Sequence, residues 1–203
     1  MTRPVADQKV RPWVYGLVKY GTTFLSRFSG IRIYGRENIP RTGRLILAGN
    51  HSSTLDPFLA SLGTARVVHY MAKKELFENK LYAWLMTHGG TFSIDRHSKA
   101  DIGAIRKALE VLNSEGVLGI FPQGTRGGSE ALDGAAYLAL KGKTPIIPMC
   151  IVKEGPWKIA YGTPIAPEGK VKELTEQVMK AIGALEQDLR LNNLDRLKPG
   201  KQR

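Results

Sequence analysis

The sequence predicts an α/β domain built on a single, mostly parallel mixed sheet flanked by helices. Short apolar runs rich in strand formers alternate along the chain with longer segments of helical periodicity. Such alternation is typical of a sheet that carries helices on both faces. At 203 residues the chain is long enough for one domain with a substantial core. We therefore expect one domain over residues 30–203, preceded by an amphipathic helical segment over residues 1–29.

The N-terminal segment carries an apolar stripe at helical spacing. Its members are Val10, Trp13, Val14, Leu17, Val18, Phe24, Leu25 and Phe28. Lys19 interrupts the stripe, which is much shorter than the roughly 20 apolar residues that a transmembrane helix needs. The pattern predicts an amphipathic helix or helix pair that either packs on the domain or lies in a membrane surface.

Positive charge is concentrated at the start of the chain. The formal net charge is +12, and residues 1–44 hold nine Lys or Arg against two Asp or Glu. This charge predicts an anionic partner, which is nucleic acid, an anionic membrane surface or an acidic substrate. No recognition-helix, RNA-binding or zinc pattern accompanies it, so nucleic acid is not an expected partner. The basic flanks and Trp13 favour contact with an anionic membrane surface.

Cysteine content and the N-terminal sequence bear on the compartment. Cys150 is the only cysteine, which excludes an intramolecular disulfide and favours a reducing compartment. Neither C-x-x-C nor H-E-x-x-H occurs, so no metal site is expected. Pro4 and Pro12 interrupt the start, and no small-residue cleavage site follows an apolar run. We therefore expect a peripheral protein on the cytoplasmic side of the membrane.

The first half of the domain supplies three strands. Residues 44–49 (RLILAG) are a short run of strand formers, and Pro57 suits the first turn of the helix that follows. Residues 65–71 predict a second strand, and residues 90–94, after a glycine pair, predict a third. Between these two strands, residues 75–87 have the pattern of a helix.

The second half continues the alternation. Apolar residues from Ile102 to Leu112 fall on one helical face, and Gly116 lies just beyond it, which predicts a helix over residues 99–114. Further strands are expected at 117–121, 144–152 and 157–161, and further helices at 131–140 and 171–191. Because ligand sites of α/β sheets gather at strand ends, the loops after the strands are where functional residues are expected.

Residues 50–57 (N-H-S-S-T-L-D-P) place an imidazole and a carboxylate on one strand-to-helix turn. His51 could accept a proton near neutral pH, and Asp56 on its other ring nitrogen would fix the tautomer and stabilise the imidazolium. No G-x-S-x-G serine occurs, and Cys150 lies in an apolar run typical of a buried thiol. The pair therefore predicts activation of a substrate hydroxyl without a covalent enzyme intermediate. In the simpler alternative, Asp56 caps the helix and His51 packs beside it.

A glycine-rich loop, F-P-Q-G-T-R-G-G, follows the strand expected at residues 117–121. Backbone amides of such a loop can surround a phosphate, and Arg126 can add a bidentate contact. The alternative is an ordinary strand-to-helix turn with a solvated arginine.

In order and spacing, these two motifs resemble blocks of the 1-acylglycerol-3-phosphate acyltransferase family, N-H-x-S-x-x-D-P and F-P-E-G-T-R. G-G-T-F-S-I-D-R at residues 89–96 and P-I-I-P-M at residues 145–149 are similar to two further blocks, and M-A-K-K-E-L-F at residues 71–77 is also family-like. The resemblance covers roughly residues 30–165. Four ordered blocks are far more specific than any one motif.

The resemblance implies an enzyme that moves a fatty acyl chain from an acyl-CoA or acyl-carrier-protein thioester to lysophosphatidic acid, giving phosphatidic acid. It implies His51 as the general base and Asp56 as its orienting partner. It implies no cofactor. It also implies a set of residues that bind the acceptor substrate, most of them through its phosphate. These candidates are Lys73, Arg96, Gln123, Gly124, Thr125 and Arg126.

Two positions depart from the family pattern. Gln123 stands where the family usually has Glu, and Asp133 stands where members often carry Lys. Both changes are expected near the acceptor site. They leave open an acyltransferase for a different lyso-lipid, or a catalytically silent lipid-binding protein at the membrane surface.

Overall fold

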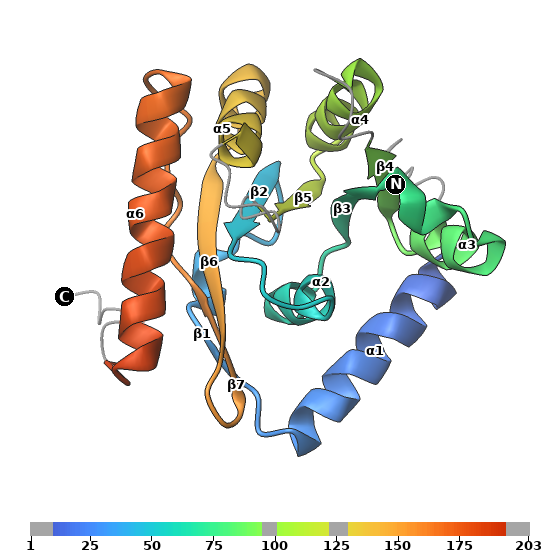
Figure 1. The fold of residues 1–203 in the computed structure, drawn as a ribbon, viewed down its shortest axis with the longest axis horizontal. Helices are drawn as coiled ribbons and strands as arrows, with labels where there is room; N and C mark the ends of the chain where they lie inside the picture. Colours follow the sequence, from blue (N-terminus) through green and yellow to red (C-terminus); the bar gives the residue numbers. More distant parts are fainter. Residues whose placement is uncertain (1–9, 95–100, 122–129, 194–203) are drawn as a thin grey trace.

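The computed structural model describes residues 10–94, 101–121 and 130–193, which form one sheet with helices on both faces (Figure 1). The strands are β1 (Arg32–Tyr34), β2 (Leu45–Gly49), β3 (Val68–Lys73), β4 (Thr91–Ile94), β5 (Val117–Ile120), β6 (Ile146–Lys153) and β7 (Trp157–Tyr161). The α-helices are α1 (Pro12–Phe28), α2 (Asp56–Ala60), α3 (Lys80–His88), α4 (Ile102–Asn113), α5 (Glu130–Gly142) and α6 (Val171–Arg190). Short 3₁₀ helices lie at η2 (Arg36–Asn38), η3 (Ser61–Gly63) and η4 (Lys74–Phe77).

The seven strands are ordered β1-β7-β6-β2-β5-β3-β4. Among these strands of the described residues, five neighbouring pairs are parallel, and β6 and β7 pair in the antiparallel sense. A three-residue connection joins β6 to β7, and so short a connection allows only an antiparallel arrangement. The predicted mostly parallel, mixed sheet is therefore confirmed.

The expected elements are present with shifted ends and one addition. The helix expected at residues 75–87 is divided, because the Asn79 side chain accepts hydrogen bonds from the backbone N–H groups of Leu81 and Tyr82 and so starts α3 late. Strand β1 was not expected. It has only three residues and pairs in parallel with β7, more than 120 positions later in the chain.

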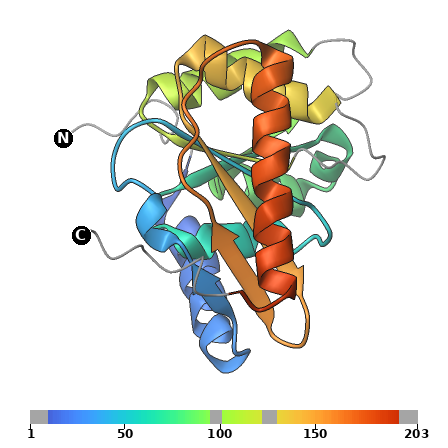
Figure 2. The ribbon, with the colours of Figure 1, turned by 90° about the vertical axis from the view of Figure 1, so that its left-hand side faces the viewer.

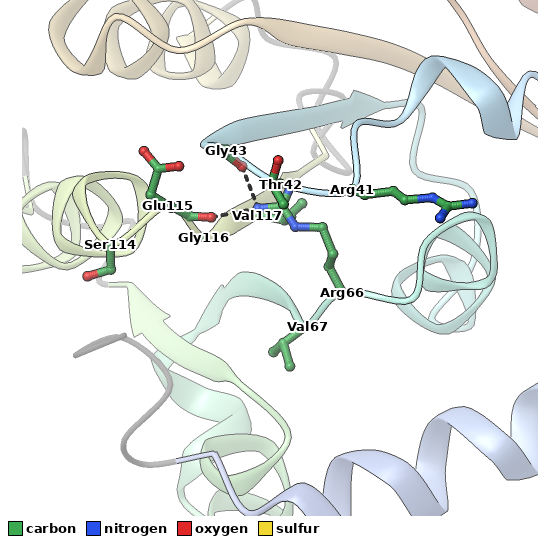
Figure 3. Close-up of a pocket in the computed structure, with 9 residues that line it drawn as sticks. All are labelled: Arg41, Thr42, Gly43, Arg66, Val67, Ser114, Glu115, Gly116 and Val117. Carbon is green, nitrogen blue, oxygen red and sulfur yellow. Dashed lines mark hydrogen bonds between the residues drawn. The ribbon is translucent and has the colours of Figure 1, made fainter. Parts of the chain in front are cut away.

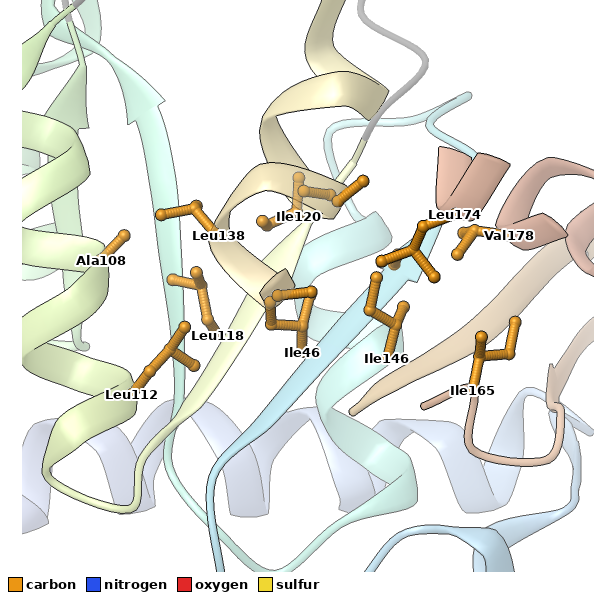
Figure 4. Packing of buried hydrophobic residues seen from close by; sticks show 14 of the residues in the cluster. Ile46, Ala108, Leu112, Leu118, Ile120, Leu138, Ile146, Ile165, Leu174 and Val178 are labelled. Atoms are coloured by element: carbon orange, nitrogen blue, oxygen red, sulfur yellow. The ribbon is translucent and has the colours of Figure 1, made fainter. Parts of the chain in front are cut away.

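Two apolar layers enclose the central strand β2. On one face, Ile46 lies between its register partners Leu118 and Ile146, beneath α4, α5 and α6 (Figure 4). On the other face, Leu45 and Leu47 pack in a second cluster that includes residues of α2 and η3. Both sets are fully buried, so β2 reads as a continuous apolar run rather than an alternating one. Figure 2 shows α6 in front of the sheet, where it packs over β6.

Helix α1 lies on the same side of the sheet as α2 (Figure 1), and most of the large side chains of its apolar stripe are exposed. Five large apolar or aromatic side chains of this helix are 58–77% exposed, namely Trp13, Leu17, Tyr20, Phe24 and Phe28. The side that faces the domain is largely polar, although Val14 is buried there. No helix in the described ranges is long and apolar enough to cross a bilayer.

Polar contacts attach α1 to the segment before β3. The Tyr15 hydroxyl donates to the Arg66 carbonyl (2.9 Å), and the Lys19 ammonium donates to the carbonyls of Thr64 and Arg66. Burial lowers the pKa of Lys19 to about 8. Lys19 therefore faces the domain, and its charge does not add to the outward basic surface that the N-terminal composition suggested.

A buried lysine joins β7 to the end of α6. The Lys158 ammonium donates to the Leu189 carbonyl (3.1 Å) and to Asn192 Oδ1 (2.7 Å). We expect Lys158→Met to lower the free energy of unfolding by about 1–3 kcal/mol, because it leaves these acceptors without a donor. Urea denaturation at neutral pH would measure this, with the exposed Lys180→Met as the matched control. Equal free energies of unfolding for the two variants would contradict a stabilising role for the Lys158 hydrogen bonds.

Candidate active site

His51 and Asp56 form a hydrogen-bonded pair at the carboxyl end of the central strand. His51 Nδ1 lies 2.9 Å from Asp56 Oδ2, and the His51 side chain is 30% exposed while that of Asp56 is fully buried. The bond to the carboxylate engages Nδ1, which leaves Nε2 as the nitrogen available to a substrate. The close pairing expected from the sequence is present, although the functional roles of both residues remain predictions.

The turn before α2 is folded around the Asp56 carboxylate. The backbone N–H groups of Ser52 and Ser53 donate to the same Oδ2, at 2.7 and 2.8 Å. Three donors thus offset the cost of burying a charged group. Asp56 also occupies the first turn of α2, where a negative charge is favourable. In the part of the chain that the structure describes, Oδ1 has no hydrogen-bond partner.

Asn50 fixes the point where the turn that carries His51 leaves the sheet. Its side-chain amide donates to the Ile151 carbonyl and accepts from the Ile151 N–H, both at 2.8 Å. These bonds extend the pairing of β2 with β6 beyond Gly49, with a side chain in place of backbone groups. His51 therefore follows a residue that is locked to the neighbouring strand. Asn50 was not among the site residues predicted from the sequence, although it opens the first motif.

Phe121 supports the imidazole from the adjacent strand. It follows β5 directly, and its ring stacks on His51 with centroids 4.8 Å apart and an interplanar angle of 25°. Phe121 was not among the predicted site residues either. The signal was available, because Phe121 is the first residue of the glycine-rich motif.

Lys73 is the one phosphate-binding candidate that the described residues include. It ends β3 and is exposed. Because β2, β5 and β3 are parallel neighbours, their carboxyl ends share one edge of the sheet, and Lys73 lies on the same edge as His51. The other candidates lie outside the described residues; they are Arg96, Gln123, Gly124, Thr125 and Arg126.

Asp133 has a structural partner on the neighbouring helix. Its Oδ1 accepts a hydrogen bond from the Thr175 hydroxyl (2.9 Å), which joins α5 to α6. This departure from the family pattern therefore has a role in helix packing. Gln123, the other departure, lies outside the described residues.

The thiol of Cys150 is unsuited to nucleophilic catalysis. Cys150 is fully buried in β6, and burial raises the pKa of its thiol to about 12. Near neutral pH it stays protonated, and a thiol is a far weaker nucleophile than a thiolate. This agrees with direct attack by a substrate hydroxyl.

An open surface cavity of about 420 Å³ lies at the opposite end of the sheet, before β2, β3 and β5 (Figure 3). Arg66 spans it and donates to the carbonyls of Pro40, Gly43 and Glu115. These bonds tie together the loops before three strands. The cavity is separate from the His51–Asp56 pair, and Arg66 has a structural explanation there.

Comparison with known proteins supports an acyltransferase. A protein named 1-acyl-sn-glycerol-3-phosphate acyltransferase from Bacillus subtilis is 29% identical over 193 residues, which cover 85% of this chain and 94% of that protein. One of the same name from Saccharomyces cerevisiae is 30% identical and matches 72% of this chain and 51% of its own length. The crystal structure of the 1-acyl-sn-glycerophosphate (LPA) acyltransferase PlsC from Thermotoga maritima superposes with a TM-score of 0.67.

That structure is 24% identical in sequence, and the superposition covers 86% of this chain and 77% of the Thermotoga chain, so it shows a common fold. The family model described as Acyltransferase matches residues 30–152, which is more than half of the chain and includes both the His51–Asp56 turn and the glycine-rich motif. The resemblance noted from the motifs is thus confirmed, and the chain belongs to the Acyltransferase family.

Proposed function

We propose that the protein transfers a fatty acyl chain from a thioester to the free hydroxyl of 1-acyl-sn-glycerol-3-phosphate, giving phosphatidic acid for phospholipid synthesis. The observation that carries the proposal is the 2.9 Å hydrogen bond between a partly exposed imidazole and a buried carboxylate. The names of the relatives from Bacillus subtilis and Saccharomyces cerevisiae support this choice of acceptor.

His51 Nε2 removes the proton from the acceptor hydroxyl as the oxygen attacks the thioester carbonyl. The C–O bond forms, the tetrahedral intermediate collapses, and the C–S bond breaks. The sulfur takes the proton from the imidazolium and leaves as a thiol, so the histidine returns to its starting state. General-base catalysis of this kind contributes about 10²- to 10⁴-fold to the rate. Asp56 holds the tautomer and stabilises the transient positive charge.

The acceptor phosphate is bound by cations and amides beside the base. Lys73 supplies one cation at the carboxyl end of β3. The family resemblance supplies the other candidates, Arg96 and the glycine-rich loop from Gln123 to Arg126. Acyl-CoA and acyl-carrier protein are both anionic donors, which suits the basic chain.

The enzyme works as a peripheral protein on the cytoplasmic side of an anionic membrane, with the outer face of α1 in the lipid interface. Helix α3 continues this surface, because Trp84 lies beside Trp13 with ring centroids 5.9 Å apart and Leu81 and Tyr82 are exposed next to it. Exposed apolar patches of this extent are unusual unless they bind a partner, and aromatic side chains suit a lipid interface. Arg11, stacked over Trp84, adds a cation at its edge.

Leu17→Glu combined with Phe24→Glu should weaken binding to vesicles of phosphatidylcholine and phosphatidylglycerol at least about tenfold, because two apolar anchors become anions. Both side chains are more than 60% exposed, so the fold should remain intact. Vesicle co-sedimentation measures the change. Tyr137→Glu adds a single negative charge at an exposed aromatic position on α5, across the sheet, and should leave binding unaltered. Equal binding by the double variant and the wild type would exclude α1 as the anchor.

The activity is tested by thiol release from palmitoyl-CoA and from palmitoyl-acyl-carrier protein, each with and without lysophosphatidic acid. Release that depends on this acceptor, with phosphatidic acid as product, supports the proposal and identifies the donor. Release only with another lyso-lipid would reassign the acceptor, and Gln123 would be the first residue to test. Binding to lipid with no release from either donor would identify a silent lipid-binding protein.

A further inference from the structure

Three aromatic rings form a continuous stack that ends on the catalytic histidine. Tyr70 of β3 stacks on Phe121, with ring centroids 5.8 Å apart and an interplanar angle of 8°, and Phe121 in turn stacks on His51. The three residues come from three neighbouring strands or the segments directly after them. The position of the His51 ring therefore depends on how Tyr70 packs on β3, two strands away from β2.

Gly119 makes this stack possible. It is the register partner of Tyr70 on β5, and a Cβ atom at this position would lie 2.1 Å from the Tyr70 ring. Without a side chain at Gly119, the tyrosine ring can lie across β5 and reach Phe121, two residues further along the same face. A glycine in the middle of a buried strand weakens it, so its presence indicates a close approach of this kind.

The hydroxyl of Tyr70 contacts the helix α2, which carries Asp56. It donates to the Pro57 carbonyl (2.9 Å), one residue after Asp56, and contacts the Ser61 hydroxyl (3.0 Å). Ser61 also donates to the Pro57 carbonyl, at 2.8 Å. Tyr70 is buried, and burial raises the pKa of its hydroxyl, so this group remains a donor at any working pH.

We propose that Tyr70 is a positioning residue that sets the distance and angle between His51 and Asp56. Its ring supports the imidazole through Phe121, and its hydroxyl holds the helix turn that carries the carboxylate. The proposal rests on the proposed role of His51 as general base. A base displaced by about 1 Å loses on the order of 10²-fold in rate, so small shifts at Tyr70 have large effects on turnover.

The test compares three variants in the thiol-release assay. Tyr70→Leu removes both the stack and the hydroxyl, and it should lower kcat about 10²-fold while the KM values of donor and acceptor change less than about twofold. Tyr70→Phe keeps the ring and should recover most of the lost kcat. Tyr161→Phe is the matched control, because it also removes a buried hydroxyl that donates to a carbonyl of α2, that of Ala60, while its ring is not one of the three in the stack.

A readout without substrate separates this proposal from the proposed function. In the wild type, the His51 ring-proton NMR signals should be displaced by the ring current of Phe121, and Tyr70→Leu should move them toward the values of a free histidine. Tyr161→Phe should not move them. Circular dichroism and thermal melting establish that each variant is folded, and if Tyr70→Leu does not fold, Tyr70→Met replaces it.

Full kcat and unmoved His51 signals in a folded Tyr70→Leu variant would overturn the proposal. An equal loss of kcat in Tyr161→Phe would overturn it too, since the effect would then be general loosening of α2. If instead the wild type releases no thiol with any acceptor, the proposed function fails, while the NMR comparison still decides whether Tyr70 positions His51.

Discussion

Replacing His51 by Ala should lower kcat by at least about 10²- to 10⁴-fold, because the substrate hydroxyl loses the base that takes its proton. The fold should survive, since the imidazole is 30% exposed and the core lies beneath the turn. The measurement is acceptor-dependent thiol release, together with vesicle binding, which should not change.

His51→Asn is the companion variant. An asparagine can donate from its amide to Asp56 much as Nδ1 does, yet it cannot act as a base. It should therefore be as inactive as His51→Ala and more stable, because the buried carboxylate keeps its third donor. Turnover near the wild-type rate in either variant would refute the general-base role of His51.

Asp56→Asn is expected to lower kcat by about 10²-fold or more through loss of charge alone. Two backbone N–H groups point at Oδ2, so the amide oxygen takes that position and the amide nitrogen takes the place of Oδ1. His51 then keeps its tautomer but loses the charge that stabilises the imidazolium. Steady-state kinetics with saturating donor measure the effect.

Asp56→Ala provides the contrast. It removes the acceptor for three hydrogen bonds, so it should lower the free energy of unfolding by about 1–3 kcal/mol in addition to its effect on rate. If Asp56→Asn is as active as the wild type, the carboxylate only holds the turn in shape. In that case the simpler interpretation, that Asp56 is a structural residue of the helix start, would be correct.

The parts of the site that the sequence predicts well are local. His51 and Asp56 are five positions apart on one turn, so their contact needs only the strand-to-helix geometry that the motif itself suggests. Asn50 and Tyr70 were missed because their contacts depend on strand order. Asn50 binds Ile151 from β6, and Tyr70 reaches Phe121 only because β3 lies beside β5.

Periodicity in α1 predicted an apolar stripe but not its direction. A stripe usually faces the core, and here tertiary contacts reverse this, because Tyr15 and Lys19 find carbonyl partners before β3. Strand β1 has only three residues, too few to show the alternation of a strand in the sequence, and it is recognised only by its pairing with β7. The phosphate-binding loop from Gln123 to Arg126 stays a prediction that rests on the motif and the family.

Because α1 is attached largely by polar contacts, the helix and the central sheet should differ in the free energy needed to open them. Strand β2 leads directly into the turn that carries His51, and its side chains are buried on both faces, so the amides of β2 should exchange with solvent only when the whole domain unfolds. Helix α1 packs mainly on α2, η3 and α3 and exposes most of its large side chains, so its opening should need much less free energy. Under the proposed function, α1 would therefore be able to change its position on a lipid surface while β2 and the His51–Asp56 turn that follows it stay folded.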